Sequence, residues 1–226
     1  MFMMNPKILK MMFDMGFGAD CSSIPELIMS RELGAKGEDI MFTSNNTDPV
    51  EFAAAAAEGG CVLNLDDISL IDKVPEFPEL VCFRYNPGPR RTGNVIIGNP
   101  VEAKYGVTHE QVVEAYRKAQ QRGAKRFGLH TMVASNELDY TYMVETARMV
   151  LEIAELVENE LGIRFEFVNI GGGFGIPYQP DQAALDIETM AKEITAQFDA
   201  FREKHGYAHR MYMESGRYMT GPHGCL

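Results

Sequence analysis

The stretch FVNIGGGFG, residues Phe167–Gly175, passes from an apolar strand directly into a cluster of glycines. The backbone N–H groups of clustered glycines can converge on an anion, which is a common way for an α/β protein to hold a phosphate group. The alternative is a tight turn, although a tight turn needs only one glycine. Gly171, Gly172 and Gly173 are therefore candidate phosphate-binding residues at the end of a strand.

Outward from this stretch, short apolar runs alternate with longer amphipathic ones, a pattern typical of repeated strand–helix units in a parallel sheet or barrel. The clearest helix is Tyr140–Leu161, because Met143, Val150 and Val157 recur at helical spacing. We predict strands near Gly18–Asp20, Ile40–Thr43, Val62–Asn64, Leu80–Tyr85, Arg126–His130, Glu166–Ile170 and Arg210–Glu214. We predict helices at Ser23–Leu33, Pro49–Glu58, Asp66–Lys73, His109–Arg122, Tyr140–Leu161 and Leu185–Lys204.

A TIM-type barrel closes with eight strands, and this pattern supplies seven. The missing strand is the first, because Asn5-Pro6-Lys7 already has the character of a strand exit and a helix start. We therefore predict an α/β fold, an incomplete (β/α)8 barrel that lacks its first strand, as one domain over residues 1–226. Unpaired strand edges near Gly18 and Met211 would recruit other chains, so we expect self-association or low stability.

Composition excludes several classes of protein. Lys and Arg total 21 against 32 Asp and Glu, a net charge of −11, and no segment gathers the cations into a stripe, so we expect no nucleic-acid partner. Apolar stretches fall short of the ~20 residues that span a bilayer, and Asn5-Pro6-Lys7 interrupts any signal peptide, so we expect a cytoplasmic protein with no membrane partner.

The cysteines and histidines do not have metal-site spacing. No CxxC pair occurs, so we expect reduced thiols, and we expect no metal site. The four cysteines are Cys21, Cys61, Cys82 and Cys225.

Polar residues follow three further predicted strands. Glu214 with Gly216 and Arg217 would suit a polar ligand with a cationic and an anionic end, or form a structural ion pair. His130 is a candidate general acid or base, or a residue that stacks on a ring. The alternative is a core histidine that is simply hydrogen-bonded. Ser135 follows His130 five residues later in the sequence.

Asp20 would face the same end of the barrel from the first predicted strand. Three residues further along the chain, Ser23 is predicted to cap the next helix. Loops at the carboxyl ends of barrel strands build active sites, and the long loops Tyr85–Val107 and Gly171–Leu185 would lie there.

In order and number, these segments resemble the fold-type III pyridoxal-phosphate (PLP) decarboxylases of the alanine racemase-like barrel family, most closely the diaminopimelate decarboxylases. The resemblance extends over essentially the whole chain. Its matching segments are GFGADCSSIPEL (Gly16–Leu27), RYNP (Arg84–Pro87), KYG (Lys104–Gly106), GLHTMVAS (Gly128–Ser135), NIGGGFGIPY (Asn169–Tyr178) and ESGRY (Glu214–Tyr218).

The resemblance implies that PLP binds at the carboxyl mouth of the barrel. Its phosphate would lie near Gly171–Gly173, Gly216 and Arg217, with Ser135 approaching it, and Arg217 could instead contact the substrate. Glu214 would pair with the pyridine nitrogen, and Asp20 and His130 would line the pocket. Glu214 and His130 are thus the implied catalytic residues.

The chain departs from the family pattern at three points. The position of the Schiff-base lysine coincides with Met1, and Lys7 and Lys10 lie beyond that strand. Met132 stands where many members carry a ring-stacking histidine. The sequence ends at Leu226, so the family's C-terminal β-domain is absent from it.

The family reaction is the decarboxylation of meso-diaminopimelate to L-lysine, a step of lysine biosynthesis. The resemblance implies this carboxy-lyase activity and a homodimer, while the missing lysine implies impaired or absent turnover in the chain as it stands. Two alternatives remain open. One is a related arginine, ornithine or carboxynorspermidine decarboxylase, and the other is a catalytically dead homologue that binds PLP or another subunit.

Overall fold

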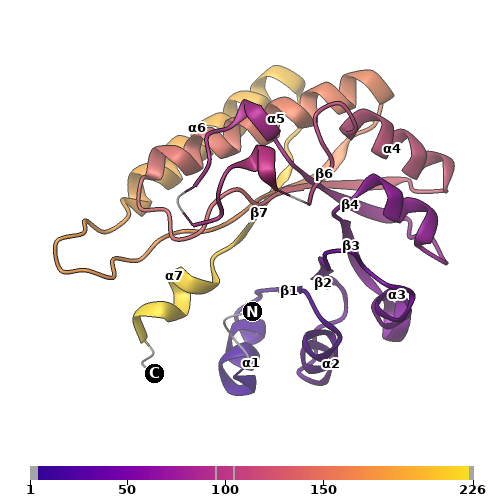
Figure 1. The fold of residues 1–226 in the computed structure, drawn as a ribbon, viewed down its shortest axis with the longest axis horizontal. Coiled ribbons are helices and arrows are strands. Elements are labelled where there is room, and N and C mark those ends of the chain that lie inside the picture. The colour runs from indigo at the N-terminus through magenta and orange to yellow at the C-terminus, as the bar shows by residue number, and fades with distance from the viewer. Residues whose placement is uncertain (1–4, 95, 104, 224–226) are drawn as a thin grey trace.

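The computed structural model describes residues 5–94, 96–103 and 105–223 and folds them into a curved parallel sheet with helices outside it (Figure 1). The sheet has seven strands in the order β1-β2-β3-β4-β5-β6-β7, each parallel to its neighbour. The strands are β1 (Ala19–Cys21), β2 (Gly37–Phe42), β3 (Cys61–Leu65), β4 (Leu80–Tyr85), β5 (Arg126–Thr131), β6 (Phe165–Gly172) and β7 (Arg210–Glu214). The α-helices are α1 (Pro6–Asp14), α2 (Ile24–Glu32), α3 (Pro49–Ala56), α4 (Val112–Gln121), α5 (Tyr140–Leu161), α6 (Ile187–His205) and α7 (Gly216–Thr220).

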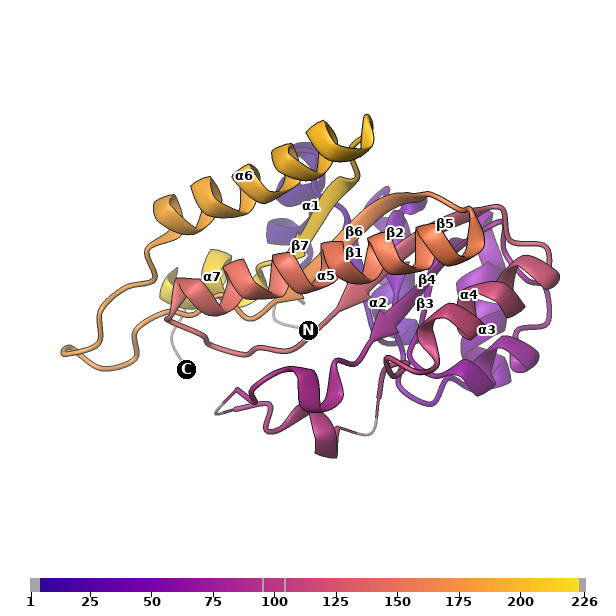
Figure 2. The same cartoon turned by 90° about the horizontal axis from the view of Figure 1, so that it is seen from above.

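This arrangement confirms the predicted fold class, an α/β barrel open by one strand. The sheet has β1 and β7 at its two edges, which are the edges predicted near Gly18 and Met211. The two long loops follow the carboxyl ends of β4 and β6, and they leave the sheet in different directions (Figure 2). Predictions for Met1, Lys104 and Cys225 fall outside the described residues, and within those residues no helix is long and apolar enough to cross a bilayer.

The predicted helix at Asp66–Lys73 is wrong, because the segment forms only a 3₁₀ turn at Ile68–Lys73. Asp67 starts this turn by accepting a hydrogen bond from the Ser69 backbone N–H at 2.7 Å. Pro75 follows closely, and a residue before proline is disfavoured in the α-helical region, so too few residues remain for an α-helix. The short helix α7 was not predicted.

The starts of α2 and α3 are stabilised by hydrogen bonds from different kinds of side chain. At α3, the N-cap residue Asp48 and Glu51 of the first turn form a capping box, and Pro49 is the first residue of the helix. Ser23 occupies the N-cap position of α2, but the predicted side-chain cap is wrong: its hydroxyl donates to the Glu26 carboxylate at 3.0 Å. Glu26 also accepts the Ser22 backbone N–H at 2.7 Å, so this acidic residue of the first turn ties the helix to the segment that precedes it.

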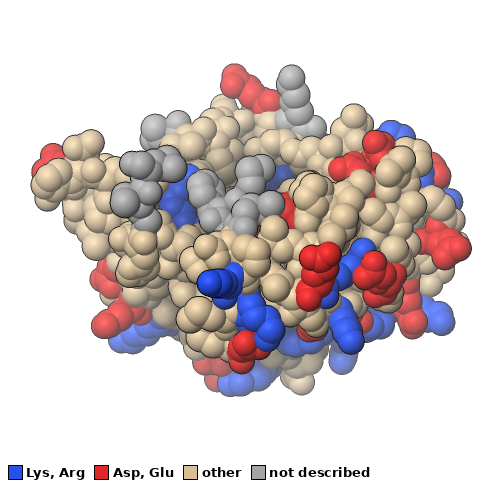
Figure 3. Space-filling model, turned by 90° about the horizontal axis from the view of Figure 1, so that it is seen from below, with Lys and Arg blue, Asp and Glu red and all other residues tan. Residues whose placement is uncertain are grey.

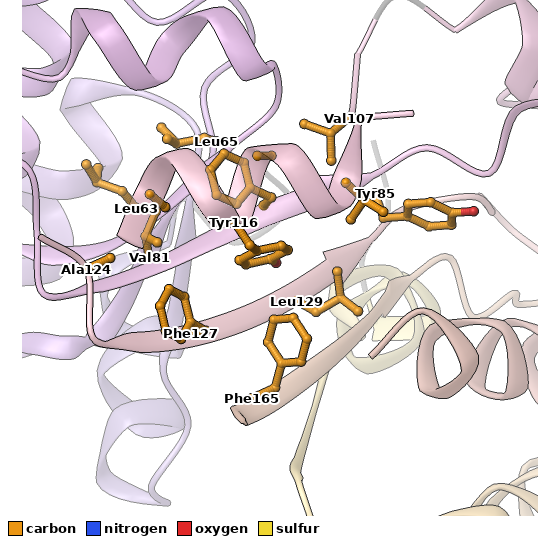
Figure 4. Close-up of a cluster of buried hydrophobic side chains, with 14 of the residues drawn as sticks. Leu63, Leu65, Val81, Tyr85, Val107, Tyr116, Ala124, Phe127, Leu129 and Phe165 are labelled. Atoms are coloured by element: carbon orange, nitrogen blue, oxygen red, sulfur yellow. The ribbon is translucent and has the colours of Figure 1, made fainter. Parts of the chain in front are cut away.

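The main core lies between the outer face of the sheet and the helices (Figure 4). Tyr116 of α4 is fully buried there, and its ring packs edge-on against Phe83 and Phe165 with centroids 4.9 Å away in both cases. Its hydroxyl donates to the Gly128 carbonyl at 2.6 Å, which satisfies the one polar atom of this side chain. The large aromatic surface therefore fixes α4 onto β4, β5 and β6.

The inside of the barrel is filled in its middle and closed at its amino end. Met41, Val62, Cys82 and Phe167 form a separate buried cluster, and Tyr212 stacks on Phe167 at 4.6 Å. At the amino end, Arg126 of β5 pairs with Glu166 of the neighbouring strand β6 and also with Glu38 of β2, a strand that is not its neighbour. These layers leave the carboxyl end as the place where polar side chains can meet a ligand.

Candidate active site

A cavity of about 390 Å³ opens at the carboxyl end of the barrel. Its walls come from the ends of five strands or the loops directly after them, so residues distant in sequence meet there. The described residues that line it are Asp20, Ser22, Thr43, Ser44, Asn45, Arg84, His130, Met132 and Glu214. Three predicted site residues, Asp20, His130 and Glu214, thus lie in one cavity.

Glu214, at the end of β7, is the best-anchored acid of the cavity. The Asn169 side-chain amide donates to its Oε1 at 2.8 Å, and His130 Nε2 lies 3.0 Å from the same oxygen. Burial acts to raise the pKa of Glu214, but the charge and hydrogen bond of His130 and the hydrogen bond from Asn169 outweigh it, so the pKa is lowered. Glu214 is therefore an ionised carboxylate at neutral pH.

His130, in β5, is almost fully buried beside this carboxylate. Its Nε2 is engaged with Glu214 Oε1 at 3.0 Å, whereas its Nδ1 has no hydrogen-bond partner among the residues that the structure describes. Buried polar atoms without such a partner are uncommon in native proteins and are found at functional sites. His130 thus has capacity to bind a further group in the cavity.

Asp20 faces Glu214 from the opposite edge strand, β1. Thr43 Oγ1 lies 3.5 Å from its Oδ1, and Asn64 Nδ2 donates to the same threonine oxygen at 3.0 Å. Protein atoms around the Asp20 carboxylate displace water from it, and this desolvation, together with the negative charge of Glu214, raises the pKa of Asp20. Since the side chain remains open to solvent at the rim, water moderates this shift.

Arg84, in β4, was not among the predicted site residues. Its guanidinium lies over the Tyr105 ring at 3.8 Å, and Nη1 lies 3.5 Å from Asn45 Oδ1. Burial lowers the pKa of Arg84, while nearby Tyr105, Glu214, Asp66 and Asp20 act in the opposite direction. A single cation in the otherwise apolar strand LVCFRY was the signal in the sequence that could have identified it.

The three predicted phosphate-binding glycines lie just outside the cavity wall, where neighbouring backbones approach closely. A Cβ on Gly172 would lie 1.9 Å from the Glu214 carbonyl oxygen, and one on Gly171 would lie 2.2 Å from that of Thr131. The Gly171 N–H donates to Asn169 Oδ1 at 2.9 Å, and the Gly172 N–H lies 3.2 Å from the Met132 sulfur. These glycines therefore bring β5, β6 and β7 together, a use that the sequence reasoning did not consider.

The remaining predicted residues lie around the same mouth. Ser135 follows β5, and its backbone N–H donates to Asn94 Oδ1 at 3.2 Å. Gly216 and Arg217 begin α7, directly after Glu214 and Ser215. Met132 lines the cavity itself. The structure thus places Ser135, Gly216 and Arg217 near the cavity but not on its described wall.

The donor and acceptor set of the cavity fits PLP. Glu214 is the ionised carboxylate that a protonated pyridine nitrogen requires, and Asn169 holds it in place. His130 Nδ1 has no partner among the described residues, and the Met132 thioether can pack against an aromatic face.

Comparisons with known proteins agree with this chemistry. Residues 2–221 match the family model described as "Pyridoxal-dependent decarboxylase, pyridoxal binding domain". Protein TabA from Pseudomonas amygdali pv. tabaci is 40% identical over 227 residues, which are 98% of this chain and 52% of TabA. Diaminopimelate decarboxylase from Thermoplasma acidophilum is 31% identical over 225 residues, which are 98% of this chain and 54% of that enzyme.

Among solved structures, diaminopimelate decarboxylase from M. jannaschii in complex with L-lysine superposes with a TM-score of 0.82 and 25% identity, over 94% of this chain and 51% of that one. The chain spans about half the length of these relatives. The cavity, its acid and the match along nearly all of the sequence lead to one assignment. The chain belongs to the pyridoxal-dependent decarboxylases and corresponds to their pyridoxal-binding barrel domain.

Proposed function

We propose that this chain is the PLP-binding barrel of an amino-acid decarboxylase whose substrate is meso-diaminopimelate and whose product is L-lysine. The observation that carries the proposal is the partly buried Glu214 carboxylate, held by Asn169 at 2.8 Å and next to His130 at 3.0 Å. When bound, PLP supplies an electron-withdrawing ring that weakens the bond to the departing CO₂. The family relatives named diaminopimelate decarboxylase support the choice of substrate.

The chain's own residues would bind and orient rather than attack. Glu214 would hold a proton on the ring nitrogen, and Asn169 would keep the carboxylate oriented for this. His130 would line the ring from β5, and Ser135, Gly173, Gly216 and Arg217 would hold the phosphate, with Arg217 alternatively binding the substrate carboxylate. Asp20 would line the opposite wall of the cavity.

A second candidate function is PLP binding without turnover, and one observation favours it. No lysine is among the described residues that line the cavity. The family chemistry needs a lysine amine that holds the cofactor and then yields it to the substrate. We therefore expect decarboxylation of meso-diaminopimelate by this chain alone to be slower by orders of magnitude than that of a lysine-bearing enzyme.

The test is a titration of the purified chain with PLP, followed by visible absorbance and then by borohydride treatment and intact mass. We expect a saturable spectral shift without a covalent adduct. Glu214→Gln should weaken the shift, and Glu188→Gln, an exposed acid on α6, should not.

Two results would contradict parts of the proposal. A borohydride-stable adduct on a single lysine would show that another lysine serves the site, so the expected loss of turnover would be wrong. The absence of any saturable shift would show that this chain does not bind PLP, and the proposed function would fail.

A further inference from the structure

One side of the cavity has no defined part in the function proposed above. It is formed by the end of β1, by the end of β2 and by the residues directly after these strands, and we call it the β1–β2 wall. Each of its side chains carries an oxygen atom that can accept a hydrogen bond. They are Asp20, Ser22, Thr43, Ser44 and Asn45. The wall can therefore contact a part of the ligand that Glu214 and His130 do not hold.

Two hydroxyl groups of the wall already direct their protons at carboxylates. The Ser44 hydroxyl donates to Glu51 Oε1 at 3.0 Å. The Thr43 hydroxyl accepts the Asn64 side-chain amide at 3.0 Å and directs its own proton at Asp20 Oδ1, which lies 3.5 Å away. A hydroxyl has one proton to donate. These two groups therefore offer lone pairs, and not protons, to a ligand in the cavity.

Asp20 adds negative charge to these acceptors. Desolvation and the charge of Glu214 disfavour its ionised form, and Arg84 offsets only part of their effect, so the pKa of Asp20 is raised. A cation bound beside Asp20 would act in the opposite direction and stabilise the carboxylate. The β1–β2 wall thus matches a ligand group that carries a positive charge and several N–H donors, and a primary ammonium group has both.

The described lining does not supply that ammonium group itself. No lysine is among the described residues that line the cavity. A metal ion is a poorer match for the wall, because the described part of the chain has no group of three or more His, Cys, Asp or Glu side chains that could hold one. The ligand therefore has to bring the ammonium group.

Two phosphorylated forms of the cofactor differ at one carbon of the pyridine ring. PLP carries an aldehyde on C4, and pyridoxamine 5′-phosphate (PMP) carries an aminomethyl group there. C4 lies across the ring from the nitrogen, so a ring whose nitrogen pairs with Glu214 directs its C4 group away from that carboxylate. An aldehyde oxygen only accepts hydrogen bonds and would meet other acceptors on the β1–β2 wall, whereas the ammonium group of PMP donates three.

We propose that the cavity selects the amine form of the cofactor, PMP, over PLP, and that Asp20 is the residue that determines this preference. The inference rests on the proposed cofactor cavity and adds the chemical form that the cavity holds best. PLP still binds, through the same ring and phosphate contacts, but more weakly than PMP.

The experiment uses three ligands that share the ring and the phosphate and differ only on C4. They are PMP, PLP and 4-deoxypyridoxine 5′-phosphate, which has a methyl group there and is called the methyl analogue below. Isothermal titration calorimetry at neutral pH gives the three dissociation constants. We expect PMP to bind about threefold to tenfold more tightly than either of the others. The gain is modest because Asp20 lies at the rim of the cavity, where water screens a charged pair.

The variants separate Asp20 from general charge effects. Asp20→Asn keeps the shape of the side chain and should bring PMP and the methyl analogue to nearly equal affinity, without a change in the affinity of the methyl analogue. Thr43→Val removes the hydroxyl directed at Asp20 and should reduce the preference about twofold. Asp72→Asn, an exposed acid outside the cavity lining, should leave the preference unchanged. If Asp20→Asn does not fold, Thr43→Val decides.

An amino acid is the other source of a primary ammonium group, and one further titration distinguishes it. L-alanine is added to the chain saturated with the methyl analogue, and we expect no binding that depends on Asp20. Binding of L-alanine that disappears in Asp20→Asn would assign the β1–β2 wall to the substrate amine and overturn the inference.

Equal affinity for PMP and the methyl analogue would also overturn it, as would a preference that survives both Asp20→Asn and Thr43→Val. A chain that binds PLP and the methyl analogue but does not prefer PMP would refute this inference alone. A chain that prefers PMP but does not bind PLP would refute the proposed function alone, and a chain that binds none of the three ligands would refute both.

Discussion

The pairing of Asn169 with Glu214 shows how a single amide can position the acid of the site and, together with His130, favour its ionised form. Asn169 points into the barrel from an otherwise apolar part of β6 and donates to Glu214 Oε1 at 2.8 Å, while its own Oδ1 accepts the Gly171 N–H at 2.9 Å. The same side chain therefore positions the acid and the start of the glycine loop. The sequence marks it only as one polar residue in the run FVNI.

Replacement of Asn169 by Leu should change the pH dependence of PLP binding. The wild-type pKa of Glu214 is below its ordinary value of 4.5, so the carboxylate stays ionised, and binding persists, until the pH falls below about that value. Loss of the Asn169 hydrogen bond removes one cause of the lowered pKa, so binding should be lost at a higher pH in Asn169→Leu. Absorbance titrations between pH 3 and 8 measure this shift, with the exposed Gln121→Leu as control. An unchanged midpoint would show that Asn169 does not set the ionisation of Glu214.

At the scale of elements, a buried acid joins the ends of α5, α6 and β7. Glu158 Oε1 accepts the Phe165 N–H and lies against His209 Nε2, both at 2.8 Å, and the Tyr207 hydroxyl donates to Oε2. Burial acts to raise the pKa of Glu158, but the hydrogen bonds from His209, Tyr207 and the Phe165 backbone outweigh it, and the pKa is lowered. Because the folded-state pKa is depressed, the contribution of Glu158 to stability is present above the unfolded value and is lost as the pH falls through the folded one.

We expect Glu158→Gln to lower the free energy of unfolding at pH 7 by about 1–3 kcal/mol, since it weakens a charged, buried hydrogen-bond centre. The loss of stability between pH 5 and 3 should also become shallower, because the variant has no carboxylate there to protonate. Urea denaturation at several pH values measures both effects, and Glu160→Gln on the exposed side of α5 is the control. Parallel pH curves for variant and wild type would show that Glu158 does not carry this linkage.

The elements differ in how much of them the sequence could predict. All seven strands were predicted within a few residues, because their apolar runs are local signals, and so were the strand-end residues Asp20, His130 and Glu214. The segment Asp66–Lys73 was mispredicted because Pro75 overrides its helical spacing. Arg84 and Asn169 were missed because their roles depend on partners that lie across the barrel and are brought close only by strand pairing.

At the scale of the whole molecule, the main consequence is that β1 and β7 are both edge strands. Charges of both signs are interspersed over the face shown in Figure 3, without a large patch of one sign to hold copies apart. Met213 of β7 is 45% exposed, and Met11 and Phe17 near β1 are 63% and 49% exposed. Unpaired backbone groups beside exposed apolar side chains favour association with another chain.

We therefore expect sedimentation velocity to show a dimer or larger species whose share grows with concentration. Met213→Lys places a charge on the β7 edge and should shift the distribution towards monomer, whereas Val50→Lys, on an exposed position of α3 that is 65% accessible, should not. A wild-type chain that stays monomeric at high concentration and unfolds only at high temperature would contradict the role of the open edges.

The proposed function depends on PLP binding at the carboxyl end of the barrel, against Glu214 and His130. Hydrogen–deuterium exchange with and without PLP tests its location most directly. We expect PLP to slow exchange in peptides that contain the ends of β1, β5 and β7 and the glycines at the end of β6, and to leave α4 and the amino end of the barrel unchanged. Slowed exchange only at surface lysines away from this mouth, or no change in any peptide at saturating PLP, would contradict it.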